Sequence, residues 1–385
     1  MEFSETSKVV GPLLARQLYM MAKEYDNVID FTIGDPDIPT DKAICQAACD
    51  AAMTGHTRYS ANAGIPELRD AISKWINKSR ETSYTANNIV TTIGATEALF
   101  IAYMALLNKG DEVIVLAPYW IQYENMAKFF GAKAVIIDKF TEGFEPDIQA
   151  IKDAITSKTK VIVVNSPNNP SGWIYRDDTL KAIAKMAKEH GLFVFSDECY
   201  EALTYTGKYQ SIAQYCEKSH LVLFNSFSKA FAMTGWRVGY LVADEELVAN
   251  TIKMHQNIAI CASVPSQYAA LEAITHADEY SSRVQKVFTN RRNVLLAELE
   301  KVQHIHYNAP DGSFYIFIDI SETGMNSKDF TFALLKEEQV AVIPGIAYGE
   351  AFDHYIRLAF TMNEDNIAEG IKRLGRFINK IFKIQ

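Results

Sequence analysis

Short apolar runs alternate with segments of helical periodicity through the middle of this chain. The runs cover residues 89–93, 112–116, 134–137, 161–164, 192–195, 221–224 and 238–242. Between two of them, Leu180, Ile183, Ala184 and Ala187 recur at helical spacing. Strands that alternate with helices imply βαβ units and a mostly parallel sheet with both faces covered. We therefore predict an α/β fold in which a seven-stranded, mostly parallel sheet lies between helices.

The two ends of the chain have a different pattern. A long charged helical segment covers residues 278–302, and strands are predicted at 312–319 and 355–360. At 385 residues the chain is too long for one small core. We predict a large domain at 45–290 and a smaller α+β domain at 291–385. Residues 1–44 are expected to form an N-terminal arm and part of the small domain.

Composition excludes several classes of partner. The chain has 38 basic and 47 acidic residues, a net charge of −9 without a basic run, which argues against nucleic acid and anionic membrane surfaces. No apolar stretch reaches the roughly 20 residues of a membrane span, and the N-terminus does not resemble a signal peptide. The five cysteines are scattered, which favours reduced thiols in the cytoplasm. No metal-ligand spacing is present, so we predict no metal site.

Unusual polar residues follow the predicted strands, just past their carboxyl ends. They occur in the segments 94–96, 118–120, 165–172, 196–200 and 225–229. In open α/β sheets, ligands bind at this edge. The clustering indicates a ligand site more strongly than any single motif does.

Lys229 is the most informative of these residues. It follows the apolar run 221–224, and a lysine in an apolar pocket is easily deprotonated and can form a Schiff base. Ser226, Ser228 and Arg237 lie nearby in sequence and are suited to holding a phosphate. Position alone favours the reading of Lys229 as a surface lysine after a strand.

Four further positions offer complementary chemistry. A buried Asp197 could keep a heteroaromatic nitrogen protonated, or it could cap the following helix. Tyr200, one helical turn later, could donate a hydrogen bond into the same pocket. Asn169 could meet a ring oxygen or simply belong to a turn, and Trp120 could stack on a ring or be part of the core.

Two anion sites are also suggested. Ala95 and Thr96 open a helix directly after a strand, where free backbone N–H groups and the helix dipole attract an anion, although a plain glycine turn is the alternative. Arg357 lies in an apolar strand and needs an anion, either a substrate carboxylate or a structural carboxylate. Gly34 could present its backbone to a ligand or only make a turn. Taken together, these groups match pyridoxal phosphate bound with an amino acid.

Ordered motifs along nearly the whole chain resemble the class I/II aminotransferases of the aspartate aminotransferase superfamily, which are fold type I pyridoxal phosphate-dependent enzymes. The matching segments are Gly34-Asp35-Pro36, Tyr59 before 63–69, Gly94-Ala95-Thr96, Pro118-Tyr119-Trp120, Asn169-Pro170-Ser171-Gly172, Asp197-Glu198-Cys199-Tyr200, residues 226–239 and Arg357. Where this chain has Cys199, the family usually has Ala or Ile. No motif identifies the arginine that dicarboxylate-specific members use for a distal carboxylate, which puts aspartate as substrate in doubt.

The resemblance implies a role for each matching residue. Lys229 would form the Schiff base and move the proton, and Asp197 would pair with the pyridine nitrogen. The remaining roles are ring-oxygen contacts from Tyr200 and Asn169, phosphate contacts from Ala95, Thr96, Ser226 and Arg237, ring stacking by Trp120, and substrate carboxylate binding by Gly34, Asn169 and Arg357. Tyr59 would reach the phosphate in the neighbouring subunit of a homodimer. The Asn169–Pro170 bond is a candidate for the cis form.

These roles predict amino transfer from an L-amino acid to a 2-oxo acid by a ping-pong mechanism. An alternative is different pyridoxal phosphate chemistry on the same scaffold, such as C–S β-elimination, because the sequence does not determine which substrate bond breaks. A ligand-sensing module without activity is a third reading. It is disfavoured because the chain has neither a basic patch nor length for a DNA-binding segment.

Overall fold

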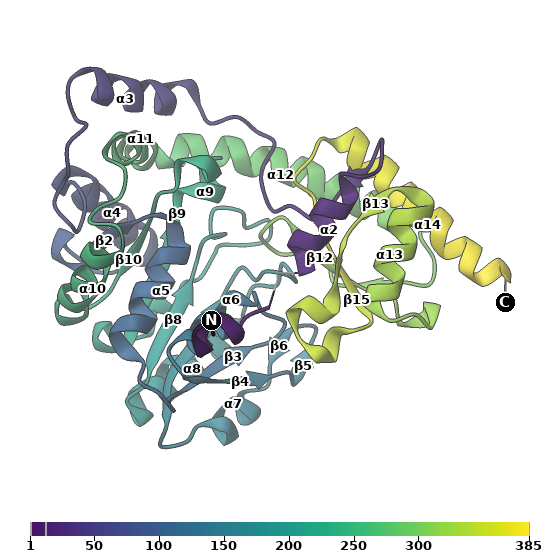
Figure 1. The fold of residues 1–385 in the computed structure, drawn as a ribbon, viewed down its shortest axis with the longest axis horizontal. Helices are drawn as coiled ribbons and strands as arrows, with labels where there is room; N and C mark the ends of the chain where they lie inside the picture. Colours follow the sequence, from purple (N-terminus) through teal and green to yellow (C-terminus); the bar gives the residue numbers. More distant parts are fainter. Residues whose placement is uncertain (1, 12–13, 385) are drawn as a thin grey trace.

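The structure, a computed structural model, describes residues 2–11 and 14–384. Its main sheet has seven strands in the order β2-β10-β9-β8-β7-β3-β4 (Figure 1). They are β2 (Ile89–Thr92), β3 (Glu112–Leu116), β4 (Lys133–Ile137), β7 (Thr159–Asn165), β8 (Phe193–Asp197), β9 (Leu221–Ser226) and β10 (Gly239–Val242). Only β10 runs antiparallel to its neighbours. Every predicted apolar run forms a strand, which confirms the α/β fold.

Helices cover both faces of this sheet because its strands are apolar on both sides. Ile114 and Ile162 pack with α3 (Lys42–Met53), α4 (Pro66–Arg80), α8 (Asp177–His190) and α11 (Val264–Thr275). Val113 and Val161, which point the other way, pack with α5 (Gly94–Leu106), α6 (Gln122–Phe129) and α10 (Glu245–Ile258). Each fully buried side chain of this size contributes about 1.5–3 kcal/mol. The two cores therefore keep the strand ends, and the loops after them, in a defined place.

A second body surrounds a small antiparallel sheet of order β11-β12-β15-β14 (Figure 1). Its elements are β11 (His306–Tyr307), β12 (Tyr315–Asp319), α13 (Ser327–Glu338), β14 (Ile343–Pro344), β15 (Tyr355–Ala359) and α14 (Glu364–Ile384). The N-terminal strand β1 (Ile29–Asp30) pairs in parallel with β13 (Val340–Ala341). Residues 29–30 thus pair with the C-terminal body.

The long helix α12 (Ala277–Leu299) connects the two bodies. Its first turns, with Ala277 and Tyr280, belong to the core of the large sheet. Further along, Phe288 and Leu295 belong to the core around the small sheet. The predicted domain boundaries, 44/45 and 290/291, remain a sequence-based prediction.

The remaining elements are short. They are α1 (Glu5–Lys8), α2 (Leu14–Ala22), β5 (Phe140–Glu142), β6 (Glu145–Pro146), α7 (Ile148–Ala154) and α9 (Phe227–Ala230). The strand β1 is only two residues long, because the chain leaves β13 after Asp30 and turns toward the pocket described below. Within the described residues, no helix is both long and apolar enough to cross a membrane.

Candidate active site

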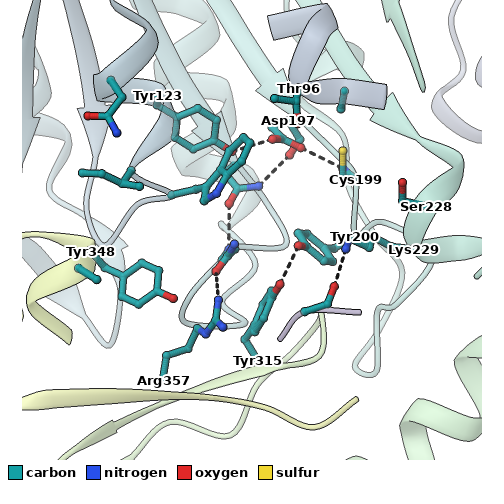
Figure 2. Close-up of a pocket in the computed structure, with 18 of the residues that line it drawn as sticks. Thr96, Tyr123, Asp197, Cys199, Tyr200, Ser228, Lys229, Tyr315, Tyr348 and Arg357 are labelled. Atoms are coloured by element: carbon teal, nitrogen blue, oxygen red, sulfur yellow. Dashed lines mark hydrogen bonds between the residues drawn. The ribbon is translucent and has the colours of Figure 1, made fainter. Parts of the chain in front are cut away.

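A pocket of about 640 Å³ lies between the large sheet and the small body. It is lined by residues from the carboxyl ends of β7, β8 and β9, the start of α5, and the C-terminal body (Figure 2). Eleven of the predicted site residues line it: Gly34, Ala95, Thr96, Trp120, Asn169, Asp197, Tyr200, Ser226, Lys229, Arg237 and Arg357. Tyr59 is not among the lining residues, and 79% of its surface is exposed in this single chain.

Lys229 lies in α9, a single helical turn that is capped at its start by the Ser226 side chain. Its Nζ donates a hydrogen bond to the Gly34 carbonyl oxygen at 2.6 Å. A Cβ atom at position 34 would lie 1.9 Å from the Tyr315 hydroxyl, so only glycine allows this close approach. The lysine amine is therefore held inside the pocket, where it meets a segment of the N-terminal arm.

Asp197 ends β8 with its carboxylate in the pocket. Its Oδ2 accepts a hydrogen bond from the Tyr123 hydroxyl at 2.7 Å, and its Oδ1 accepts one from the Cys199 N–H at 3.2 Å. Burial raises the pKa of Asp197, and the hydrogen bonds from Tyr123 and Cys199 only partly oppose this effect. A cation beside the carboxylate would remove the cost of ionising it.

Tyr200 and Asn169 face the same space from two different loops. The Tyr200 hydroxyl lies 3.1 Å from that of Tyr315, and burial raises the pKa of Tyr200 well above its ordinary value. The Asn169 N–H donates to Asn165 Oδ1 at 2.9 Å, which orients the Asn-Pro loop. The predicted cis bond at Asn169–Pro170 is confirmed.

The start of α5 forms an anion cradle with Arg237. Gly239 allows β10 to approach the helix start, because a Cβ there would lie 2.5 Å from the Ala95 nitrogen. A Cβ at Gly94 would lie 2.8 Å from Arg237 Nη2, so the guanidinium lies against the first turn of the helix. Free N–H groups, the helix dipole and a guanidinium at one point favour a phosphate.

Arg357 projects from β15 toward the pocket and is only 6% exposed. Its Nη2 donates to the Thr32 carbonyl oxygen, its Nη1 lies 3.5 Å from Asn169 Oδ1, and its Nε has no partner. The guanidinium carbon lies 4.4 Å from the Tyr315 ring centroid. Among the described residues, the polar contacts of Arg357 are a carbonyl and an amide oxygen, and no carboxylate is paired with it. This favours a bound anion over a structural salt bridge.

The comparisons with known proteins agree with this geometry. A family model described as aminotransferase class I and II matches residues 26–374. The chain belongs to this aminotransferase family. It is 36% identical to a probable aspartate/prephenate aminotransferase of Aquifex aeolicus, over 96% of this chain and 95% of that protein. It is also 36% identical to a probable aspartate aminotransferase of Methanocaldococcus jannaschii, over 99% and 100% of the two chains.

Solved structures give the same result. The aspartate aminotransferase of Thermus thermophilus with maleate superposes with a TM-score of 0.94 at 33% identity, over 98% of this chain and all of that chain. An alanine aminotransferase of Pyrococcus furiosus has the same TM-score at 31% identity and the same coverage. The aminotransferase therefore resembles neighbours that are named for different amino acids.

Sequence reasoning missed three tyrosines in the pocket of this aminotransferase. Tyr123 is bonded to Asp197, Tyr315 to Tyr200, and Tyr348 faces Arg357 with its ring centroid 5.5 Å from the guanidinium carbon. Tyr123 follows Trp120 by one helical turn, which is a signal that could have been used. Tyr315 carries no local signal, because its contact with Tyr200 lies across the boundary between the two bodies, and Tyr348 carries none, because it meets Arg357 from a separate segment.

Proposed function

We propose that this aminotransferase binds pyridoxal phosphate in the pocket and moves an amino group from an L-amino acid to a 2-oxo acid. One observation carries the proposal. A lysine amine, a carboxylate with a raised pKa, a cationic helix start and an incompletely paired arginine line the same pocket. Each of these groups matches one part of the cofactor or of the substrate.

The residues present fit the cofactor. Ala95, Thr96, Ser226 and Arg237 would hold its phosphate, Trp120 would lie against its ring, and Asn169 and Tyr200 would contact its ring oxygen. Asp197 would keep its ring nitrogen protonated, which also relieves the cost of an ionised buried carboxylate. When bound, the cofactor supplies a carbonyl for the lysine amine and a ring that takes up negative charge from the substrate α-carbon.

Substrate binding and proton transfer are assigned to different residues of the chain. Arg357 binds the substrate α-carboxylate through its guanidinium, with Gly34 and Asn169 beside it, and so fixes the position of the α-carbon. The Lys229 Nζ removes the α-proton as a base and returns a proton as an acid. Because donor and acceptor both need the Arg357 site, they bind in turn, and ping-pong kinetics should follow.

We further propose that the preferred donor has a neutral, apolar or aromatic side chain. Several relatives are named for aspartate, which carries a second carboxylate. Within the described residues, the cations lining the pocket are Lys229, Arg237 and Arg357, and each already has a role. Other lining residues are Leu14, Trp120, Ile121, Ile346, Ala347 and Tyr348, which favour an apolar group over an unpaired carboxylate.

The test is a half-reaction without an amino acceptor. Protein loaded with pyridoxal phosphate is mixed with L-phenylalanine, L-glutamate or L-aspartate, and the visible spectrum is recorded. Stoichiometric 2-oxo acid and loss of the yellow absorbance would support amino transfer, with the fastest change expected for phenylalanine. Pyruvate and ammonia from a cysteine conjugate, without an acceptor, would instead favour β-elimination. A protein that takes up no pyridoxal phosphate contradicts the whole proposal, and faster reaction with aspartate contradicts the side-chain preference alone.

We also propose a homodimer in which Tyr59 completes the phosphate site of the neighbouring subunit. Tyr59 is exposed in the single chain and lies outside its own pocket. Sedimentation would give the oligomeric state. Tyr59→Phe should weaken cofactor binding without changing the dimer, whereas unchanged binding contradicts this role.

The cytoplasm is the compartment we propose for this enzyme. All five cysteines are free thiols in the structure, and Cys199 lies in the pocket itself. A reducing environment would keep them in this state. Fractionation of the source cells, followed by an activity assay, tests this assignment.

A further inference from the structure

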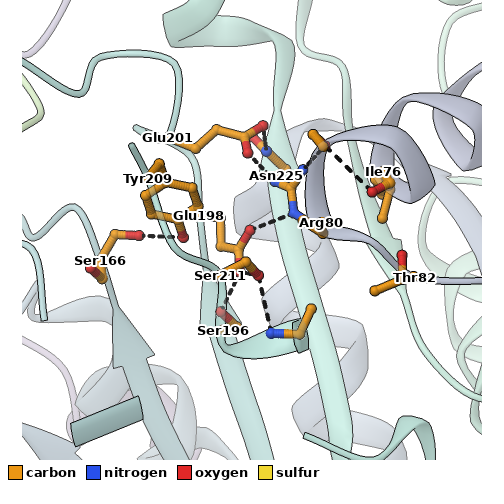
Figure 3. A network of polar contacts seen from close by, with 12 residues as sticks. Ile76, Arg80, Thr82, Ser166, Ser196, Glu198, Glu201, Tyr209, Ser211 and Asn225 are labelled. Carbon is orange, nitrogen blue, oxygen red and sulfur yellow. Dashed lines mark hydrogen bonds and ion pairs between the residues drawn. The ribbon is translucent and has the colours of Figure 1, made fainter. Parts of the chain in front are cut away.

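A second set of charged residues lies behind the pocket, on the opposite side of the loop that carries Asp197 and Tyr200. It consists of Arg80 at the end of α4, Glu198 and Glu201 in the turn after β8, and Asn225 on β9 (Figure 3). We call these four residues the Arg80 cluster. None of the roles proposed above uses it.

The Arg80 cluster is largely closed to solvent, with only the Glu201 side chain partly exposed, and its hydrogen bonds are satisfied. Arg80 is 1% exposed, and its Nε donates to Glu198 Oε2 at 2.7 Å while its Nη2 donates to Glu201. Its Nη1 donates to Ser79 Oγ at 2.7 Å. The second oxygen of Glu198 accepts from the hydroxyls of Ser196 and Ser211, at 2.9 and 2.5 Å. The guanidinium therefore ties two carboxylates together in a fixed geometry.

Each acidic or amide member of the cluster is covalently next to a proposed cofactor contact. Glu198 follows Asp197, Glu201 follows Tyr200, and Asn225 precedes Ser226. Asn225 also bonds in both directions. Its Nδ2 donates to Glu201 Oε1 at 2.8 Å (Figure 3). Its Oδ1 accepts from the Ser226 N–H at 2.7 Å. A shift of Glu198, Glu201 or Asn225 is thus transmitted to the pocket through one peptide bond or one hydrogen bond.

We propose that Arg80 is a positioning residue, which sets the orientation of Asp197, Tyr200 and Ser226 toward the cofactor through Glu198, Glu201 and Asn225. The proposal rests on the proposed function, since it concerns the same pocket. Arg80 touches neither cofactor nor substrate. Its effect is to hold in one place the contacts for the ring nitrogen, the ring oxygen and the phosphate.

Electrostatics explains why one arginine has this influence. The cluster contains two carboxylates and one guanidinium, so Arg80 is its only positive charge. Burial would by itself lower the pKa of Arg80, but the carboxylates of Glu201 and Glu198 outweigh burial and raise it. Burial raises the pKa of Glu201, and Arg80 opposes that effect. Without Arg80, two buried carboxylates would face each other, and the turn 198–201 would have to move to admit water or protons.

A purely structural role is the competing explanation. Buried ion pairs are often no better for stability than apolar side chains of the same size, but they can select one conformation. The two roles differ in what they change. A structural role alters only the stability of the fold, whereas a positioning role also alters how the intact pocket holds its cofactor.

The experiment compares Arg80→Met and Arg80→Lys with the control Ile72→Ala. Ile72 is a fully buried apolar residue about two turns from Arg80 on the same helix, so its truncation is expected to lower stability alone. Three properties are measured: the melting temperature of the cofactor-free protein, its dissociation constant for pyridoxal phosphate, and the pH midpoint of the visible spectrum of the loaded protein. The last property reports the surroundings of the bound ring.

For Arg80→Met we expect cofactor binding weaker by about tenfold or more, the size typical of losing one hydrogen bond to a charged group. The midpoint of the pH titration should shift. Arg80→Lys should be intermediate in both properties, because lysine keeps the charge but lacks the planar guanidinium that bonds to both carboxylates. Ile72→Ala should lower the melting temperature and leave the other two properties unchanged. If Arg80→Met resembles Ile72→Ala in all three measurements, the positioning role is wrong.

If Arg80→Met does not fold, Glu201→Gln keeps the volume and leaves a balanced Arg80–Glu198 pair. It should still weaken cofactor binding by a few fold and shift the midpoint, because Asn225 loses its charged partner. Unchanged affinity and midpoint in Glu201→Gln overturn the proposal. Failure of the proposed function is distinguishable, since wild-type protein would then take up no pyridoxal phosphate.

Discussion

The Arg80 cluster and the pocket lie on opposite sides of one loop, and they treat charge in opposite ways. Arg80 and Arg357 are almost equally buried, 1% and 6% exposed, yet Arg80 contacts two carboxylates and Arg357 contacts a carbonyl, an amide and aromatic rings. Glu198 and Asp197 show the same contrast one residue apart. Glu198 is paired with a guanidinium, whereas Asp197 accepts from a hydroxyl and a backbone N–H.

The difference teaches how to separate structural from functional charge in a buried site. Desolvated charges are tolerated when an opposite charge and full hydrogen bonding accompany them. In the Arg80 cluster the protein supplies both. In the pocket it supplies neither a cation for Asp197 nor an anion for Arg357 among the described residues, so ligands must supply them. The unmatched charges of both signs describe a ligand with a cationic ring and an anionic substituent.

The largest effect on stability is expected from replacing Arg80, whose charge is paired with two carboxylates. Arg80→Met leaves two uncompensated buried carboxylates and should reduce the free energy of unfolding by about 3–5 kcal/mol. Chemical denaturation of the cofactor-free protein measures it. A loss below about 1 kcal/mol would show that the carboxylates are neutralised in some other way.

Arg357 has no carboxylate partner in the protein, so Arg357→Met should reduce activity and not stability. Loss of a bidentate charged contact should lower kcat/KM by about 10²–10³. The unfolding free energy should stay within about 0.5 kcal/mol of wild type or increase, because an incompletely paired buried guanidinium is removed. Steady-state kinetics and denaturation of the same preparation measure the two quantities. A stability loss as large as that of Arg80→Met would show that the two arginines do not differ in kind.

An unreactive carboxylate ligand should test the same contrast, because it supplies the anion that Arg357 lacks in the protein. 3-Phenylpropionate resembles phenylalanine without its amine and should stabilise the loaded protein by about 2.7 kcal/mol at a hundredfold excess over its Kd. Arg80→Lys should keep this response and Arg357→Met should lose it. Equal stabilisation of Arg357→Met would place the carboxylate elsewhere.

Maleate serves as the matched dicarboxylate in the same measurement. If the pocket surface that faces the substrate side chain is apolar, as proposed, maleate should stabilise the protein less than 3-phenylpropionate at equal concentration. The opposite order would indicate a cation for the second carboxylate, supplied by the neighbouring subunit.

The fold could be predicted because strands buried on both faces leave a local signal. Each strand of the large sheet is a short apolar run, so its position does not depend on distant residues. The strands β13 and β14 share the apolar run 340–344, but the run does not show that it divides between two sheets, because that pairing depends on register with distant segments. The sheet edge where the ligand residues collect followed from the parallel strands alone.

Arg80 shows why part of the site could not be predicted. It is the last residue of α4, where a basic side chain normally lies in solvent and interacts favourably with the helix dipole. Its actual partner, Glu198, is 118 positions away, and nothing near Arg80 in sequence indicates that it is buried. Tyr123 and Asp197 are likewise 74 positions apart. Residues whose chemistry is local could be assigned by type and place, whereas those that act through distant contacts required the structure.

The smallest expected effect tests Asp197 itself, through the pH dependence of stability. Because burial raises its pKa in the cofactor-free protein, the folded state binds more protons than the unfolded state above the ordinary Asp pKa of about 4. Stability should therefore fall as pH rises from there through the raised pKa, by at most about 1.4 kcal/mol per pH unit. Asp197→Asn, which cannot ionise, should lack this component.

The measurement is the difference in unfolding free energy between wild type and Asp197→Asn from pH 4 to 7, first without cofactor and then with it. Bound pyridoxal phosphate should abolish or reverse the fall, because a protonated ring nitrogen favours the ionised carboxylate. Glu145→Gln is the matched control, since Glu145 is also buried but accepts hydrogen bonds from Trp173 and Arg176 outside the pocket, and its contribution should not depend on cofactor. If the wild-type difference is the same with and without cofactor, Asp197 does not face the ring nitrogen, and the contrast between Asp197 and the neighbouring Glu198 fails.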